Sequence, residues 1–523
     1  MPEPRRAALR GAGADGDASR HLRERSLRRR LKLCLAAVWA LVVALLTPTF
    51  LGRAADDLFI TYRYAFNLAH GQGLVFNPGE HVFGLTNPGL ALLLAALHEL
   101  TGVPVHLLGT VVFALALWAL ASFLLVAARG ATEIAVAAVG GTLVVGSTLL
   151  WVNNGTEQVP ALLLLVVAAM VGRRRPVVAG ILAGAAVWLR PEAAIGVGLL
   201  VVLEWIEAKR FPWRLVVPAV AVIGLGAGLA ELYYGSAFPA TFEAKRTMAE
   251  SRPGSFSGPL RFWFRGGRVL ARHWGPLLPL VAALGVVGLW PLAARSHRPL
   301  RLVALYGLAT AVAYPLLGVP FFPWYAVPAV IAALYGLAAV AVATGRRLAE
   351  RLLPAYRRTA RGLVSAVVAG LVLAVPLGSM LTVCVPWLEH FEGYGRYRTY
   401  RLAGEWIERH SKTGERIAYG EIGTLAYFSE RPVDDLLGIT TPRSLPYVRA
   451  HDPAGAFLAA PPTFFVEHPQ GPHRGLVTRP WFERGYRLVA TIPPAPGERG
   501  AMKIYRRRDG VPLPPPQGRH DPS

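Results

Sequence analysis

Long apolar runs, separated by short polar segments, make up most of this chain. The runs cover residues 31–51, 89–101, 105–127, 134–151, 158–172, 176–189, 192–206, 213–233, 275–294, 300–317, 324–343 and 362–386. Many of them approach the roughly 20 residues that a helix needs to cross the hydrocarbon core of a bilayer. The pattern therefore predicts an α-helical polytopic membrane protein.

Clusters of arginine and lysine between the runs predict which loops face the cytoplasm. They lie at residues 28–30, 173–175, 209–214, 295–301 and 346–361, and basic loops are typically cytoplasmic. Five runs precede residue 173, yet both ends of this stretch should lie inside, so an even number must cross. The run 89–101 would reach only about 20 Å as a helix, against a hydrocarbon core of about 30 Å. We expect it to stay on the outer side as a juxtamembrane or re-entrant helix, which leaves about 11 transmembrane helices among the runs.

The last quarter of the chain is more polar and predicts a small extracytoplasmic α/β domain at residues 387–510. Strands are expected at 416–419, 463–466, 486–492 and 502–505, and helices at 397–410 and 424–428. The remaining parts are a basic cytoplasmic tail (1–30), a transmembrane domain (31–386) with outer loops at 52–104 and 234–274, and a disordered tail (511–523). A cleaved signal peptide is the alternative for the run 31–51, which is longer than the usual apolar region of roughly 7 to 15 residues.

Composition and charge narrow the class of function. Of the 523 residues 53% are hydrophobic, the mean hydropathy is +0.39 and the formal net charge is +23, which excludes an ordinary soluble protein. The basic excess at membrane flanks favours membrane lipids and an anionic substrate over nucleic acid. Charged residues such as Arg190, Glu204 and Glu231 fall near the ends of the runs, whereas ion-coupled transporters usually carry ionisable groups near the bilayer midplane.

The first outer loop holds the strongest candidate for catalysis. Asp56 and Asp57 stand just beyond the first membrane exit, and adjacent carboxylates raise each other's proton affinity, which can poise one of them as a general base. The alternative is that one of them caps the helix beginning near Leu58. Residues 58–69 fit an amphipathic helix along the interface, with Arg63 and Asn67 on its polar stripe.

Several other residues are candidates for binding a substrate or a metal. His70 and His81 flank a turn-rich segment but lack a third ligand, so a divalent metal is an alternative that the sequence does not favour. The second outer loop is rich in basic residues, which could hold lipid headgroups or a phosphate. Arg190 could pair with Glu157 or Glu192 at the membrane rim. Trp324 and Tyr325 could stack on a sugar or a prenyl chain, or belong to an aromatic belt.

Five segments together resemble a known family. They are the stretch DDLFITYRYAFNLAHGQGLVFNPGEHVFGLTNPG starting at Asp56, NNGTEQ at 153–158, RPE at 190–192, YYGSAFPATFEAKR at 233–246 and FFPWY at 321–325. They resemble the GT-C superfamily of bacterial membrane glycosyltransferases, of the kind that includes mycobacterial terminal arabinofuranosyltransferases. The polar C-terminal part is similar to the periplasmic domain of that group. Phe83 and Leu85 stand where members often carry an acidic and an aromatic residue, which leaves acceptor recognition open.

This resemblance implies a function and a set of site residues. It implies an inverting glycosyltransferase of the bacterial inner membrane that moves a sugar, arabinofuranose or another pentose or hexose, from a polyprenyl-phosphate donor to an envelope glycan, lipid or protein. The base would be Asp56, with Asp57 as the alternative. Donor or phosphate contacts would be Arg63, Arg190, Lys245 and Arg246. Substrate contacts would be Tyr64, Asn67, His70, Glu80, His81, Asn87, Glu157, Trp324 and Tyr325.

Two other classes of function remain open. A transporter or flippase of lipid-linked sugars would also need many crossings and a basic outer surface, although the uncharged centres of the runs and the paired carboxylates argue against it. A noncatalytic scaffold could bind envelope glycans through the C-terminal domain. No resident cofactor is expected.

Overall fold

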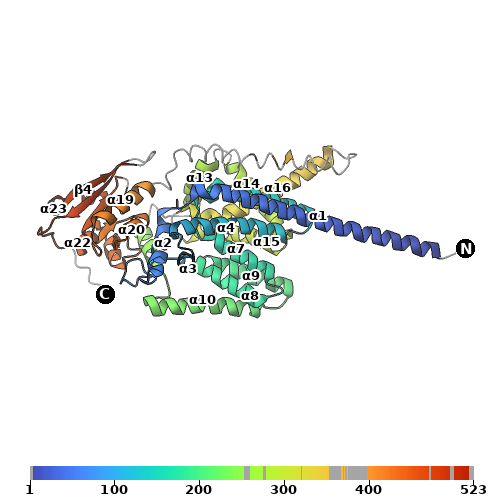
Figure 1. Cartoon of the computed structure of the whole chain (residues 1–523), viewed down its shortest axis with the longest axis horizontal. Helices are drawn as coiled ribbons and strands as arrows, with labels where there is room; N and C mark the ends of the chain where they lie inside the picture. Colours follow the sequence, from blue (N-terminus) through green and yellow to red (C-terminus); the bar gives the residue numbers. More distant parts are fainter. Residues whose placement is uncertain are drawn as a thin grey trace.

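The computed structural model describes residues 4–251, 259–274, 278–317, 319, 321–352, 367, 368, 370, 374, 397–469, 471, 473–494 and 500–516. A bundle of long helices forms one part, and a smaller α/β domain lies at one end of it (Figure 1). The N-terminus lies beyond the other end of the bundle, far from the α/β domain (Figure 1). The chain is thus a multi-pass helical membrane protein with a small C-terminal sheet domain.

The bundle is built from helices that follow the apolar runs. Among the described residues, five are long and apolar enough to cross a membrane: Arg25–Phe50 within α1 (Pro4–Phe50), α4 (Val105–Ala127), α10 (Trp213–Tyr234), α15 (Arg298–Leu316), and the segment Pro323–Arg351 formed by η2 (Pro323–Ala326) and α16 (Val327–Leu352). The bundle also contains shorter helices: α5 (Ala131–Val145), α6 (Thr148–Val152), α7 (Gln158–Val171), α8 (Pro176–Leu189), α9 (Ala193–Ala208) and α14 (Leu278–Arg295). The apolar runs in the described part of the chain form helices because a helix satisfies its backbone hydrogen bonds within lipid.

Two details of these helices differ from the sequence prediction. The run 134–151 is not one helix, since α5 ends at Val145 and α6 begins at Thr148, with Gly146 and Ser147 between them. Residues 346–351 were expected in a cytoplasmic loop but continue α16 to Leu352. The eleventh expected crossing, 362–386, lies outside the residues that the structure describes, apart from a few positions.

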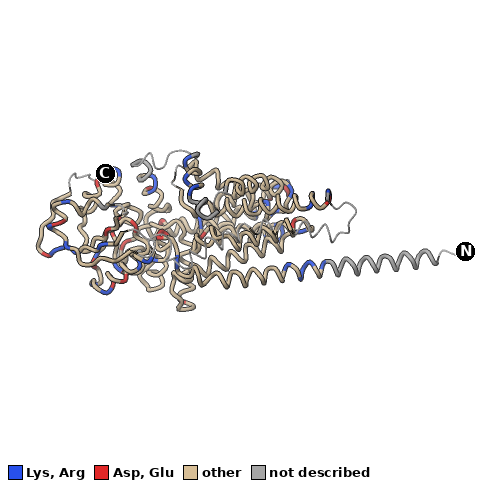
Figure 2. Tube along the Cα trace, turned by 90° about the horizontal axis from the view of Figure 1, so that it is seen from above, with Lys and Arg blue, Asp and Glu red and all other residues tan. Residues whose placement is uncertain are grey.

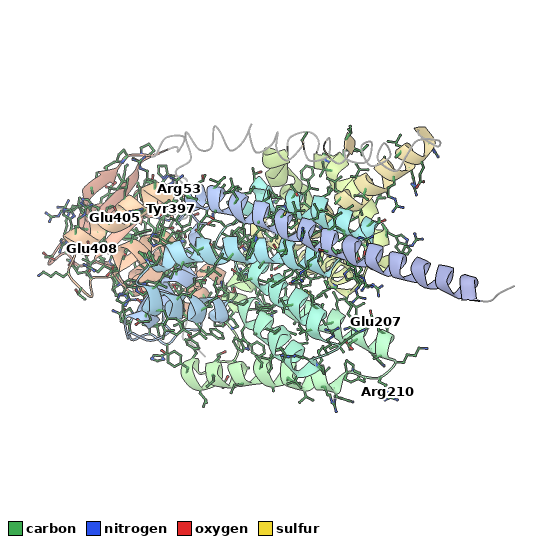
Figure 3. All side chains as sticks on the ribbon, turned by 45° about the vertical axis from the view of Figure 1, so that its right-hand side comes forward. Arg53, Glu207, Arg210, Tyr397, Glu405 and Glu408 are labelled. Carbon is green, nitrogen blue, oxygen red and sulfur yellow. The ribbon has the colours of Figure 1, made fainter. Side chains whose placement is uncertain are left out.

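A cluster of ion pairs lies at the end of the bundle remote from the C-terminal domain. Glu207 accepts hydrogen bonds from Arg173 (2.5 Å) and from Arg298 (2.8 Å), and Arg298 also pairs with Glu204. Figure 3 shows Glu207 and Arg210 at this end, and Arg53 and Tyr397 at the opposite end. The middle of the bundle is largely uncharged (Figure 2). Basic residues predicted to lie on one side of the membrane therefore gather at one end of the bundle.

Small residues let some helices approach closely. A methyl group at Gly288 of α14 would overlap the carbonyl oxygen of Gly336 in α16, and one at Gly336 would overlap that of Gly285. Helices in a membrane gain stability from such close packing because lipid provides little hydrophobic drive for their association.

Four further helices lie near the end of the bundle that adjoins the C-terminal domain. They are α2 (Asp56–Ala69), α3 (Pro88–Thr101), α11 (Ala240–Ser251) and α13 (Pro259–Trp274). The predicted short helix after residue 88 is α3, which packs against α2, α4 and α8. On α13, Trp263 donates a hydrogen bond from its indole to the Ala311 carbonyl at 3.0 Å.

The C-terminal domain contains a five-stranded sheet in the order β2-β1-β3-β5-β4. Its strands are β1 (Ile417–Tyr419), β2 (Val433–Asp435), β3 (Phe464–Glu467), β4 (Tyr486–Ile492) and β5 (Met502–Arg507). Strand β1 runs parallel to β2 and β3, whereas β5 runs antiparallel to β3 and β4. Its helices are α19 (Tyr397–His410), α20 (Gly423–Ser429), α21 (Leu445–Arg449), α22 (Pro453–Ala459) and α23 (Pro480–Gly485), with short η4 (Pro442–Ser444) and η5 (Arg474–Leu476).

This domain is joined to the loop 52–104, predicted to be the first outer loop, by specific contacts. The side-chain amide of Asn77 donates to the Val433 carbonyl (3.0 Å) and accepts from the Val433 N–H (2.9 Å). Arg416 of the domain pairs with Glu80 of the loop at 2.8 Å. The ring of Phe59, on α2, lies 5.7 Å from that of Phe428. The domain and the loop therefore form one interface.

Candidate functional site

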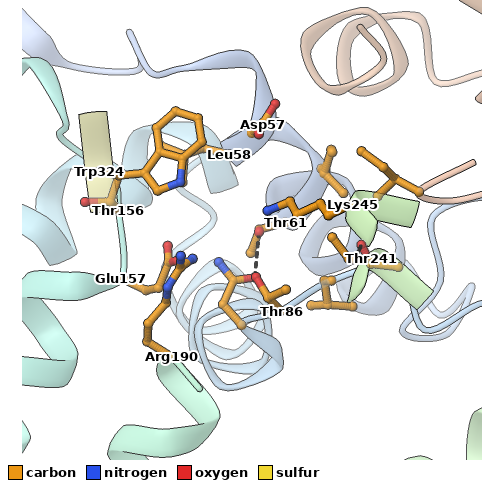
Figure 4. A pocket seen from close by; sticks show the side chains of 15 residues that line it. Asp57, Leu58, Thr61, Thr86, Thr156, Glu157, Arg190, Thr241, Lys245 and Trp324 are labelled. Carbon is orange, nitrogen blue, oxygen red and sulfur yellow. Dashed lines mark hydrogen bonds and ion pairs between the residues drawn. The ribbon is translucent and has the colours of Figure 1, made fainter. Parts of the chain in front are cut away.

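A pocket lies where α2, the turn before α3, α11 and the ends of bundle helices next to the C-terminal domain meet. It has about 560 Å³ of free space, part of it open to solvent. Its lining residues are Asp57, Leu58, Ile60, Thr61, Gly84, Leu85, Thr86, Asn87, Thr156, Glu157, Arg190, Thr241, Lys245, Trp324 and Ile439. Figure 4 shows the charged and polar side chains arranged around it. Six of the residues singled out in the sequence, Asp57, Asn87, Glu157, Arg190, Lys245 and Trp324, share this pocket.

Asp57 faces the pocket from the first turn of α2. Its side chain is exposed to the pocket, yet the surrounding protein displaces most bulk water, and this desolvation raises the pKa of Asp57 to about 6. Lys245 opposes the shift through its positive charge, whereas Asp56 adds to it. A carboxylate with such a pKa is still ionised at neutral pH and holds a proton more readily than an ordinary aspartate.

Asp56 has a different environment, although it is adjacent in sequence. Its carboxylate accepts hydrogen bonds from the backbone N–H groups of Gly423 (3.1 Å) and Thr424 (2.8 Å), at the start of α20. These donors are among those that a helix leaves unsatisfied at its N-terminus. Neither aspartate caps α2, whose N-cap is Ala55 and has no side-chain hydrogen bond. Asp56 therefore caps a helix of the C-terminal domain.

Arg190 is held between carboxylates at the base of the pocket. It donates to Glu192 at 2.5 Å and also pairs with Glu157. Tyr314 contacts Arg190 at 3.4 Å and donates to Glu192. The guanidinium lies 5.4 Å from the centre of the Tyr325 ring. Both ion pairs considered from the sequence are present, so Arg190 is fixed in position and largely neutralised.

Lys245 is the second cation of the pocket. Its ammonium donates to the Tyr325 hydroxyl at 2.9 Å and lies 5.5 Å from the centre of the Tyr325 ring and 5.7 Å from that of Phe322. Within the described part of the chain, no carboxylate lies within ion-pair distance of it. Its charge is therefore available to an anion that enters the pocket.

Threonine hydroxyl groups line the pocket between the charged side chains of Asp57, Arg190 and Lys245. Thr61 donates to the Asn87 side-chain oxygen at 2.8 Å, and Thr241 donates to the Gly84 carbonyl at 2.9 Å. Thr86 and Thr156 also line the pocket. These threonines were not singled out from the sequence, although all of them lie inside the segments that resemble the family. Their side chains suit a ligand with several hydroxyl groups.

Three predicted contacts lie behind the pocket and support its loop. Asn67 donates to the carbonyls of Val75 (2.8 Å) and Phe76 (2.9 Å). The Tyr64 hydroxyl donates to the Val82 carbonyl at 2.6 Å. Arg63 is also buried. The expected polar stripe of α2 therefore does not face solvent, because the following loop folds back and covers it.

The remaining predicted residues lie away from the pocket lining. His70 and His81 are exposed, and each bonds a backbone carbonyl, that of Phe66 and that of Tyr233. Glu80 lies at the domain interface, Arg246 is exposed, and Tyr325 reaches the pocket through Lys245 and Arg190. Within the described ranges, no group of three or more His, Cys, Asp or Glu side chains could hold a metal ion.

Comparison with known proteins bears on the fold. Residues 392–510 match a family described as a domain of unknown function, DUF8728. The sequence matches none of the curated proteins. Among solved structures, ArnT from Cupriavidus metallidurans bound to undecaprenyl phosphate is similar with a TM-score of 0.59 and 15% identity, over 92% of this chain and 99% of that chain.

Two further structures are similar. ArnT from the same organism in the apo state has a TM-score of 0.54 and 15% identity, over 91% of this chain and 99% of that chain. An Archaeoglobus fulgidus oligosaccharyltransferase in complex with Zn and sulfate has a TM-score of 0.47 and 11% identity, over 83% of this chain and 68% of that chain. The predicted fold class is confirmed: the chain has the GT-C-like fold of ArnT, a helical membrane domain followed by a small C-terminal α/β domain.

Proposed function

We propose that this protein is a glycosyltransferase that moves a sugar from a polyprenyl-phosphate donor to a hydroxyl group of an envelope glycan, lipid or protein. The observation that carries the proposal is the meeting of Asp57, Arg190 and Lys245 in one pocket at the outer end of the bundle. The fold of ArnT, which was solved with undecaprenyl phosphate bound, supports a lipid-phosphate donor.

Asp57 is the general base in this proposal. A sugar hydroxyl is a weak nucleophile, and a carboxylate within hydrogen-bonding reach accelerates its attack by taking its proton. Asp57 faces the pocket, whereas Asp56 is engaged with the N–H groups of Gly423 and Thr424. This difference favours Asp57 over Asp56, the residue that the family resemblance puts first.

Lys245 is the main contact for the leaving group. When the bond between the anomeric carbon and the phosphate oxygen breaks, its electron pair stays with the lipid phosphate, whose negative charge needs a cation. Lys245 has no carboxylate partner among the described residues, while Arg190 is already paired with Glu157 and Glu192. We therefore propose that Lys245 binds the phosphate. Arg190 lines the pocket in a fixed position, and its positive charge is partly neutralised by Glu157 and Glu192.

The donor sugar would lie between Trp324, Thr156 and Glu157. An indole offers a flat apolar face for a sugar ring, and hydroxyl side chains match the ring's own hydroxyls. One displacement by the deprotonated acceptor inverts the anomeric centre, since no covalent intermediate forms. The sugar is arabinofuranose or another pentose or hexose. The pocket would open on the outer side of a bacterial inner membrane, with the N-terminus in the cytoplasm.

The test is a transfer assay with purified protein. Radiolabelled polyprenyl-phosphate pentoses and hexoses are incubated with envelope glycans and glycolipids, with and without EDTA to measure any metal requirement. We expect a new glycosidic product, and a loss of about 10²–10⁴-fold in turnover for Asp57→Asn, with donor binding retained. Movement of the donor across proteoliposomes without any product would instead identify a flippase. Glycan binding with neither outcome would identify a scaffold.

A further inference from the structure

One wall of the pocket comes from the C-terminal domain. Ile439 is the lining residue that the domain contributes, from the loop 435–441, which begins at Asp435, the last residue of β2. A Cβ atom at Gly84 would lie 3.0 Å from the Ile439 carbonyl oxygen and 3.0 Å from the Thr440 methyl group. The absent side chain of Gly84 thus lets this loop touch the turn before α3, which carries Leu85, Thr86 and Asn87 into the pocket.

Asp435 holds this loop in its conformation. Its carboxylate accepts the backbone N–H groups of Leu437 (2.8 Å), Ile439 (2.5 Å) and Thr440 (3.1 Å), and its side chain is fully buried. Its own N–H donates to the Thr441 hydroxyl at 3.0 Å. Burial raises the pKa of Asp435 to about 6, while these N–H donors lower it. A buried carboxylate with three backbone donors fixes a loop more firmly than neutral side chains would.

The strand before the loop is fixed to the membrane domain. Asn77 bonds both the N–H and the carbonyl of Val433. Arg416 joins Asp434 of β2, at 2.5 Å, to Glu80 of the outer loop, at 2.8 Å. The position of Ile439 relative to the pocket therefore depends on contacts on both sides of the interface.

The direction of entry distinguishes the two substrates. The prenyl chain of a donor must stay in the lipid, so the donor reaches the pocket from the bundle side, where Arg190 stands. The C-terminal domain lies beyond the end of the bundle (Figure 1). A substrate that enters beside Ile439 comes from outside the membrane. In a transfer reaction this second substrate is the acceptor.

Resting on the proposed function, we propose that loop 435–441 forms the acceptor-binding wall, with Ile439 as a specificity-determining residue and Asp435 as its positioning residue. Ile439 and Leu85 present apolar surface beside the hydroxyls of Thr86 and Thr241. Such a mixture suits an uncharged sugar, which has apolar ring faces and hydroxyl edges. The acceptor class is therefore a neutral glycosyl hydroxyl rather than a charged group.

The test compares Ile439→Ala and Ile439→Trp with Leu437→Ala, a matched truncation in the same loop at a residue outside the pocket lining. Loss of the apolar contact should raise the acceptor KM about 10-fold and leave the donor KM unchanged. Ile439→Trp, which narrows the acceptor side of the pocket, should lower transfer more than Ile439→Ala and leave the donor KM unchanged. Leu437→Ala should change neither KM. An unchanged acceptor KM in both Ile439 variants, or a change in the donor KM alone, would overturn the inference.

Asp435→Asn provides a second readout, because an asparagine oxygen cannot replace both carboxylate oxygens. We expect a higher acceptor KM with an unchanged donor KM; a loss of folding in this variant would leave the Ile439 comparison to decide. The transfer assay on the wild type distinguishes failure of the proposed function from failure of this inference. If the proposed function were wrong, the wild type would yield no glycosidic product with any donor. Product from the wild type together with indifferent Ile439 variants would refute this inference alone.

Discussion

Replacing Asp56 by asparagine separates the roles of the two adjacent aspartates. The change keeps the shape of the side chain but removes its charge and one acceptor oxygen. In the native protein the two oxygens accept from Thr424 N–H at 2.8 Å and Gly423 N–H at 3.1 Å. In the variant one of these N–H groups would face an NH₂ group, which is also a donor.

The size of the effect follows from these contacts. Hydrogen bonds to a charged group contribute about 1.5–3 kcal/mol each, so losing one of the two should weaken the docking of α20 on α2 by roughly 2 kcal/mol, or about 30-fold in the local opening equilibrium. Turnover should fall far less than in Asp57→Asn, for which the loss of a general base gives about 10²–10⁴-fold.

Hydrogen–deuterium exchange measures this docking directly. We expect faster exchange at the amides of Gly423 and Thr424 in Asp56→Asn, and unchanged exchange there in Asp57→Asn. The transfer assay is run on the same preparations. If Asp56→Asn lost all turnover while the exchange of these two amides stayed native, Asp56 would be the base and the assignment to Asp57 would be wrong.

Further predictions concern the cations, pH and the interface. Turnover should fall as pH decreases through about 6, because protonated Asp57 cannot accept a proton. Lys245→Met should move this acidic limb of the pH–rate profile to higher pH, since the Lys245 charge lowers the Asp57 pKa. An acidic limb at the same pH in the variant would contradict this. Lys245→Met should also weaken donor binding by about 10-fold or more in a binding titration. Arg190→Ala should destabilise the protein by about 3–5 kcal/mol, because Glu157 and Glu192 lose their partner; an unchanged thermal midpoint in detergent would argue against it. Gly423→Ala should disrupt docking, since the added methyl overlaps the Asp56 carbonyl oxygen, whereas Gly475→Ala, with open space around it, should have no effect on exchange.

The sequence predicts much of the helical bundle because each span depends on local hydrophobicity. The runs 105–127 and 176–189 coincide with α4 and α8. The break between α5 and α6 was missed because Gly146 and Ser147 occur within an apolar run, where no polar segment marks a helix end. Strand β2 was also missed, since its Val-Asp-Asp sequence is short and polar and depends on pairing with β1.

The candidate site was predictable in its chemistry and less so in its geometry. Sequence segments far apart in the chain supplied Asp57, Lys245 and Arg190, and the pocket brings these three together. The sequence could not decide between Asp56 and Asp57, because the partners of Asp56 stand more than 360 positions away, at Gly423 and Thr424. Ile439 lies in the C-terminal part that resembles the family but was not singled out there, since an isolated isoleucine is an ordinary core residue.

The side-chain amide of Asn77 covers part of one edge of the sheet in the C-terminal domain. Strand β2 is the terminal strand of the sheet, and Asn77 occupies both hydrogen-bonding groups of Val433 on its outer side. If residues 397–516 were produced without the membrane part, that edge would be bare and could recruit a strand from another copy. Soluble preparations of the isolated domain should then self-associate, and a short peptide spanning residues 74–80 should keep them monomeric.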